Sequence, residues 1–167
     1  MNQARVLVAC IGNIFLGDDG FGVEVAARLS ARPRPGDVRV IDFGIRGIDL
    51  TYALLEDYER VILVDTIQRG GEPGSLYVIE PGASPPEGGL LQTHEMAPAK
   101  ALAAARALGP VTAHIILVGC EPESFGSEEE PRMGLSARIE AAVDEAVALI
   151  EALAAGSGAA FAAGRTP

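Results

Sequence analysis

A continuous apolar run near the start of the chain, residues 6–11, constrains the fold more than any other feature. A run this short without polar alternation is typical of a strand buried on both faces of a parallel sheet. It leads through a glycine-rich loop into a segment in which Phe21, Val25 and Leu29 recur at helical spacing. A buried strand followed directly by a helix is the repeating unit of α/β proteins.

The same alternation continues along the chain and predicts an α/β fold with a mostly parallel sheet of about five strands. Further strands are expected at residues 38–41, 61–64, 75–80 and 112–119. Helices are expected at residues 23–29, 48–55, 93–108 and 136–153, the last with Ser136 as its N-cap. No helix separates the strand at 75–80 from the strand at 61–64, so we expect it to run antiparallel at an edge of the sheet.

The loop after the first strand does not suit a phosphate group. Gly12 and Gly17 have the spacing of a P-loop, but Asp18 and Asp19 occupy the positions where that loop carries Lys and Ser or Thr. Two carboxylates would repel a phosphate, so the loop indicates cation binding or proton transfer. Because Asp is also a good N-cap, we expect the first helix to begin at Asp18 or Asp19.

Carboxylates follow three predicted strands in succession. Asp18 and Asp19 follow the first strand, Asp42 the second and Asp65 the third. Sites in open α/β sheets lie beyond the carboxyl ends of the strands, so parallel strands would bring these acids to one edge. An Asp after a strand also serves turns and caps, which is the simpler explanation for any one of them. Their repetition favours a site.

The two histidines differ in context. His114 begins an apolar strand, which indicates a structural role, whereas His94 follows a loop rich in Pro and Gly. Asp19, Asp65 and His94 together would offer two carboxylates and one imidazole, a set that suits a borderline divalent metal such as nickel or zinc. Carboxylates alone would suit magnesium or calcium better. A carboxylate pair that activates water for peptide hydrolysis is the alternative.

Charge and hydropathy exclude several classes of partner. The net charge of −10 disfavours binding to nucleic acid or to an anionic membrane. Apolar runs stay well short of the roughly 20 residues of a membrane span. The chain enters its first strand without a signal peptide, which predicts a cytoplasmic protein.

The two cysteines, Cys10 and Cys120, lie in or beside apolar runs, so we expect buried thiols in a reducing compartment. A disulfide or a thiolate metal site is the alternative. The length predicts one domain over residues 1–155, and the small, glycine-rich stretch 156–167 predicts a disordered tail.

An ordered set of motifs resembles one known family, the endopeptidases that mature the large subunit of nickel-iron hydrogenases. The set comprises residues 12–22, 42–47, 64–66, 73–76, His94, 118–124 and 134–136. The resemblance extends from the start of the chain to about Leu153. It implies a three-layer α/β/α sandwich around a twisted sheet.

The resemblance also implies an activity, the removal of a C-terminal extension from the hydrogenase large-subunit precursor after nickel insertion by an aspartic-type or nickel-dependent endopeptidase. The metal-contacting positions of the family fall on Asp19, Asp65 and His94, and these are the expected catalytic residues. Asp42 is a weaker candidate for substrate positioning or catalysis. The first ligand is Glu in some members, and Phe43 stands where many members have Gly.

The nickel is expected to arrive with the precursor, the one partner implied, rather than to be held by the resting enzyme. The enzyme is expected to be a monomer that binds neither nucleic acid nor membrane. Three alternatives remain: a nickel-checking chaperone that does not cut, a nucleotide-binding α/β module, and a related α/β peptidase with another substrate.

Overall fold

Five strands form one sheet in the computed structural model, which describes residues 4–82 and 97–156. The strands are β1 (Val6–Ile11), β2 (Val38–Gly44), β3 (Arg60–Thr66), β4 (Leu76–Ile79) and β5 (His114–Cys120). Their order is β2-β1-β3-β5-β4, and all neighbours are parallel except β4, which pairs antiparallel with β5 at an edge. The predicted α/β class and the antiparallel edge strand are both confirmed.

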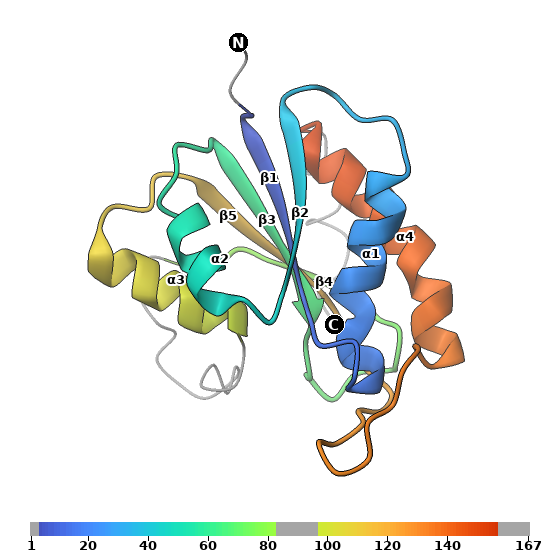
Figure 1. Ribbon diagram of the computed structural model, residues 1–167. Helices are drawn as coiled ribbons and strands as arrows, with labels where there is room; N and C mark the ends of the chain where they lie inside the picture. The colour runs from blue at the N-terminus through green and yellow to red at the C-terminus, as the bar shows by residue number, and fades with distance from the viewer. Residues whose placement is uncertain (1–3, 83–96, 157–167) are drawn as a thin grey trace.

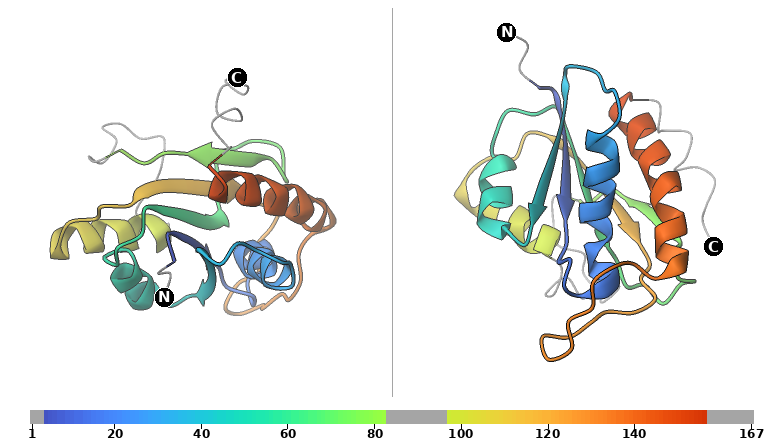
Figure 2. Two further views of the ribbon diagram at one scale, coloured as in Figure 1. Left: turned by 90° about the horizontal axis from the view of Figure 1, so that it is seen from above. Right: turned by 45° about the vertical axis from the view of Figure 1, so that its right-hand side comes forward.

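Helices cover both faces of the sheet (Figure 1). Helices α1 (Phe21–Ser30) and α4 (Ala137–Ala154) lie on one face, and α2 (Gly47–Ala53) and α3 (Ala97–Leu108) lie on the other. The view from above in Figure 2 shows the same three layers. Within the described ranges, no helix is both long enough and apolar enough to cross a bilayer.

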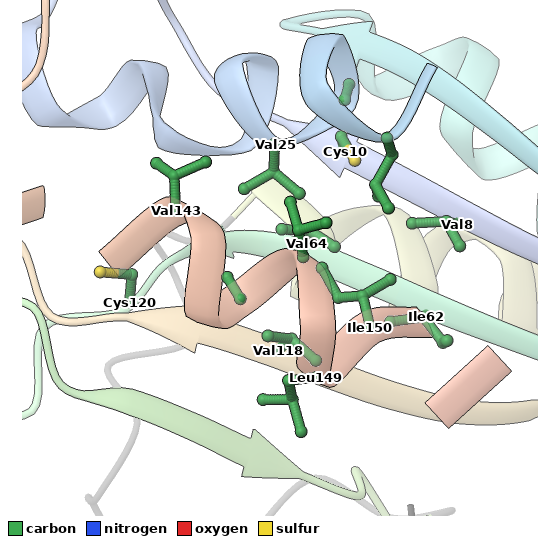
Figure 3. Packing of buried hydrophobic residues seen from close by; sticks show 14 of the residues in the cluster. Val8, Cys10, Val25, Ile62, Val64, Val118, Cys120, Val143, Leu149 and Ile150 are labelled. Atoms are coloured by element: carbon green, nitrogen blue, oxygen red, sulfur yellow. The ribbon is translucent and has the colours of Figure 1, made fainter. Parts of the chain in front are cut away.

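The apolar core is divided by the sheet because successive side chains of a strand point to opposite faces. Figure 3 shows the α1/α4 side, where Val8, Val64 and Val118 of three neighbouring strands pack against Val25 of α1 and Ile150 of α4. The alternate residues of the same strands form a second cluster beneath α2 and α3. Each of these apolar strands therefore contributes side chains to both clusters. The apolar stripe of α4 is buried throughout: Ile139, Val143, Val147, Ile150 and Leu153.

Both cysteines are buried, free thiols, as expected. Burial is the main reason that the pKa of each thiol is raised, to about 12 for Cys120. Neither is therefore a reactive thiolate at neutral pH.

Strands β1 and β3 are neighbours, but the connections that leave them go to opposite sides of the sheet. The chain goes from β1 to β2 on one side and from β3 to β4 and β5 on the other. Such a switch point is where open α/β sheets place their sites. The start of α1 packs directly on it, since a Cβ on Gly22 would lie 2.1 Å from the carbonyl oxygen of Ile11 and 2.9 Å from that of Val64. Only glycine fits there.

Several predicted boundaries were wrong. A 3-10 turn, η1 (Gly17–Gly20), precedes α1, so Asp18 and Asp19 lie in that turn and neither caps the helix. Asp42 and Asp65 are strand residues rather than post-strand residues, because ladder pairing with β1 and β5 continues past the apolar runs. The predicted helix start at Thr93 and the predicted tail lie outside the described residues.

Candidate functional site

Asp19 and Asp65 meet at the carboxyl ends of β1 and β3, as predicted from the sequence. Thr66 joins them: its hydroxyl donates to Asp19 Oδ1 at 3.3 Å, and its backbone N–H donates to Asp65 Oδ1 at 2.8 Å. The backbone N–H of Asn13 donates to Asp19 Oδ2 at 3.1 Å. The two carboxylates are thus held beside one another with few donors around them.

Electrostatics couples the pair. Burial first, and then the charge of Asp19, raise the pKa of Asp65 well above its usual 3.8. Burial also raises the pKa of Asp19, opposed by the hydrogen bonds from Asn13 and Thr66. Asp65 is buried and Asp19 is half-buried, and two interacting carboxylates resist double ionisation unless a proton or a cation lies between them. The pair is therefore suited to holding either one.

The backbone of the first loop aims Asp19 at β3. A Cβ on Gly12 would lie 2.1 Å from the carbonyl oxygen of Asp19, so a larger residue would push η1 away from the strand. The N–H of Gly12 donates to Gly44 O at 3.0 Å, and the N–H of Asn13 donates to Asp19 O at 3.2 Å. Gly12, which shares the spacing of a P-loop glycine, allows a close return of the chain.

Asp18, the neighbour of Asp19, faces a different part of the molecule. Its Oδ2 accepts hydrogen bonds from the backbone N–H groups of Glu123 and Ser124 and from the hydroxyl of Ser136, each at 2.9 Å. Its Oδ1 accepts one from the backbone N–H of Ser136 at 2.6 Å. Asp18 therefore clamps the loop between β5 and α4 to η1. The hydroxyl of Ser136 serves this clamp and not the predicted N-cap bond.

Asp42 lies apart from the acid pair. It is an exposed residue of β2, and its Oδ1 accepts a hydrogen bond from the N–H of Gly44 at 2.8 Å within its own turn. Strand β1 separates β2 from β3, which carries Asp65. Asp42 lies at the same sheet edge, and its weaker role stays a prediction.

His94 lies outside the described residues, so its predicted place beside the acid pair stays a prediction. Among residues 4–82 and 97–156, no group of three or more His, Cys, Asp or Glu side chains could hold a metal ion. His114 is exposed at the start of β5, with Nε2 at 3.3 Å from Glu80 Oε1. That end of the strand is opposite the acid pair, which leaves His114 no part in the site.

Sequence reasoning missed Glu121, a buried carboxylate directly after β5. It accepts hydrogen bonds from the N–H groups of Arg69 and Gly70 and from the hydroxyl of Tyr77 at 2.8 to 3.1 Å. These contacts fix the chain just beyond Thr66. The signal that identified Asp65, an acid at the end of an apolar strand, could have found it.

A sequence model of a protein family described as hydrogenase maturation protease matches residues 23–153. This chain belongs to the hydrogenase maturation protease family. It is 35% identical over 133 residues to the hydrogenase expression/formation protein HupD of Bradyrhizobium diazoefficiens, covering 76% of this chain and 69% of HupD.

Solved structures of maturation proteases share the fold. The hydrogenase maturating endopeptidase HybD from Escherichia coli superposes with a TM-score of 0.73 at 28% identity, covering 92% of this chain and 94% of HybD. The hydrogenase 2 maturation peptidase from Thaumarchaeota archaeon SCGC_AB-539-E09 gives 0.66 at 33% identity, covering 92% and 99%. This maturation protease is therefore a hydrolase whose family acts on hydrogenase precursors.

Proposed function

We propose that this protease removes a C-terminal extension from a hydrogenase large-subunit precursor after nickel insertion, and that Asp19 and Asp65 bind the nickel carried by that precursor. The observation that supports this most is the pair formed by buried Asp65 and half-buried Asp19 at the switch point of a maturation-protease fold. The family supplies the substrate class, and the pair supplies a place for a cation.

The donor balance around the pair favours a cation ligand. Asp65 accepts a hydrogen bond only from Thr66 among the described residues, and Asp19 accepts from Asn13 and Thr66. A divalent ion would bind the free lone pairs and would offset the repulsion between the two carboxylates. Nickel accepts carboxylate and imidazole ligands together, and we propose His94 as the imidazole.

A site with two or three ligands leaves coordination positions for groups of the precursor. Such a site would bind free nickel weakly and would hold nickel firmly only with the ligands of the precursor, so cleavage would depend on correct metal loading. Binding of the ion would displace the proton that Asp65 holds because of its raised pKa. Thr66 and Asn13 would keep the carboxylate of Asp19 oriented throughout.

The same pair could also cut without metal contact, with protonated Asp65 as the acid and ionised Asp19 activating water. The raised pKa of Asp65 is the observation that favours this second mechanism. The two mechanisms differ in their nickel requirement.

The test is processing of the cognate large-subunit precursor with and without nickel, followed by intact mass. We expect a nickel-dependent loss of a C-terminal peptide. Cleavage without nickel would support the acid-pair mechanism instead. A stable complex without a smaller product would indicate a nickel-checking chaperone.

Histidine variants test the third ligand. We expect His94→Ala to abolish processing, whereas His114→Ala, at the opposite end of the sheet, should process normally. Normal processing by His94→Ala would remove His94 from the site.

A further inference from the structure

An exposed apolar surface lies beside the acid pair and has no part in the chemistry above. It consists of Phe15, Phe125 and Met133, which are 54%, 39% and 67% exposed, and is called the apolar rim below. Phe15 comes from the loop after β1, and the other two come from the loop between β5 and α4. Exposed aromatic and Met side chains grouped on a surface are typical of protein interfaces.

Backbone hydrogen bonds bring the two loops side by side. The N–H of Arg132 donates to Phe15 O at 2.8 Å, and the N–H of Gly17 donates to Arg132 O at 2.7 Å. Met133 follows Arg132 directly, so it lies next to the Phe15 segment. Figures 1 and 2 show this loop, drawn in orange, projecting beyond the start of α1.

The rim is preorganised. The Asp18 clamp holds one end of the loop, and Arg132 Nη1 donates to Ser124 Oγ at 2.8 Å across its base. A surface that is already ordered loses little conformational entropy when a partner binds. Exposure of apolar side chains on an ordered loop favours a binding role over a solvated one.

Acidic side chains border the rim. Glu128, Glu129 and Glu130 are exposed at the tip of the same loop, in a turn closed by a hydrogen bond from the N–H of Ser127 to Glu130 O at 3.1 Å. An apolar centre with charge of one sign at its edge selects a partner with the opposite charge pattern and speeds its association.

The rim is continuous with the acid pair. Asp18, which holds the rim loop, and Asp19, which belongs to the pair, are consecutive residues of the four-residue turn η1. A partner docked on the rim is therefore placed in a fixed position relative to Asp19.

We propose that the apolar rim docks the folded body of the hydrogenase precursor, through an apolar patch of the precursor surrounded by Lys and Arg. This docking is separate from recognition of the cleaved segment and of nickel, and it rests on the function proposed above. Docking raises the affinity for the precursor and fixes its position relative to Asp19, whereas the acid pair carries the chemistry.

The first test uses the double variant Phe15→Ala/Met133→Ala, which removes side chains and leaves the backbone bonds to Arg132 in place. We expect the KM for nickel-loaded precursor to rise about tenfold, with kcat within about twofold of the wild type. Leu108→Ala is the matched control, since Leu108 is 64% exposed at the end of α3, away from the site. Thermal unfolding checks that all variants fold.

The second test concerns charge. Glu129→Lys should slow association with the precursor several-fold at low salt and weaken its salt dependence. Asp57→Lys makes the same change of charge at an exposed position before β3 and should leave the rate unchanged.

An unchanged KM for the double variant, with normal processing by the wild type, would overturn the docking surface alone. If the wild type does not process the precursor, the proposed function fails, and direct binding of the precursor to wild type and double variant then decides the surface. A double variant that alters only self-association in sedimentation would assign the rim to a second copy of this chain and overturn the proposal.

Discussion

Asp18 and Asp19 are consecutive residues of one short turn, yet they have opposite surroundings. The carboxylate of Asp18 is fully buried and accepts four hydrogen bonds from Glu123, Ser124 and Ser136. Burial alone would raise its pKa, but these donors outweigh burial and hold the pKa below 3.8. Asp19 accepts two hydrogen bonds and lies against Asp65, and burial raises the pKa of both members of that pair.

The difference shows that donors, more than burial, decide the state of a carboxylate in this protein. A carboxylate with all its lone pairs engaged stabilises the fold and has nothing left to offer a substrate. A buried carboxylate with few donors costs stability and is available for a proton or a cation. The Asp18 clamp is thus structural, and the acid pair is the candidate functional element.

The largest expected effect tests the functional half of the comparison. Asp65→Asn should lower processing by about a thousandfold, equivalent to ~4 kcal/mol in the barrier, because an amide can neither bind nickel as a carboxylate nor supply the acid proton. The same change relieves repulsion from Asp19, so stability should stay equal or increase. Precursor processing and urea unfolding of the same preparation check both. A large loss of stability would make Asp65 structural instead.

The structural role of Asp18 predicts that its removal lowers stability. Asp18→Ala leaves four hydrogen-bond donors without their acceptor, empties a fully buried position, and should lower the free energy of unfolding by about 3 kcal/mol. Asp144→Ala is the control, since Asp144 makes a surface ion pair with Arg28 and should change stability by less than about 1 kcal/mol. Urea unfolding measures both. Equal effects of the two variants would show that the clamp contributes nothing beyond surface charge.

The pH dependence of stability should separate the two kinds of carboxylate. The pKa of Asp18 is lowered by folding, so its stabilisation is present above about pH 4 and is lost as the pH falls through its folded value. The pKa of Asp65 is raised by folding, so stability is lost as the pH rises from about 4 towards its folded value.

Unfolding of wild type and Asp65→Asn from pH 3 to pH 8 tests this. The free energy of unfolding of the variant should increase relative to that of the wild type as the pH rises above about 4. A constant difference between the two curves would mean that Asp65 titrates normally in the folded protein.

The smallest expected effect concerns Asp42, which lies at the same edge of the sheet but is not part of the acid pair. Asp42→Asn retains an acceptor for the N–H of Gly44 and should lower kcat/KM about threefold, with stability within about 0.5 kcal/mol of the wild type. A loss as large as that of Asp65→Asn would place Asp42 among the catalytic residues.

The sequence by itself determined the architecture and half of the site. Apolar runs too short for buried helices, alternating with helical stripes along most of the chain, required a mostly parallel sheet covered on both faces. Acids at the ends of β1 and β3 then had to meet at one edge. These are local, periodic patterns, and backbone geometry converts them directly into positions.

Only the tertiary structure decided which acid does what. The partners of Asp18 lie 105 to 118 residues away in the chain, so its role cannot be read from neighbouring residues. The same holds for Glu121, whose donors Arg69 and Gly70 come from the connection after β3 and whose donor Tyr77 comes from β4. The charge state and role of a buried carboxylate depend on the donors that distant segments bring to it, and those donors come together only when the chain folds.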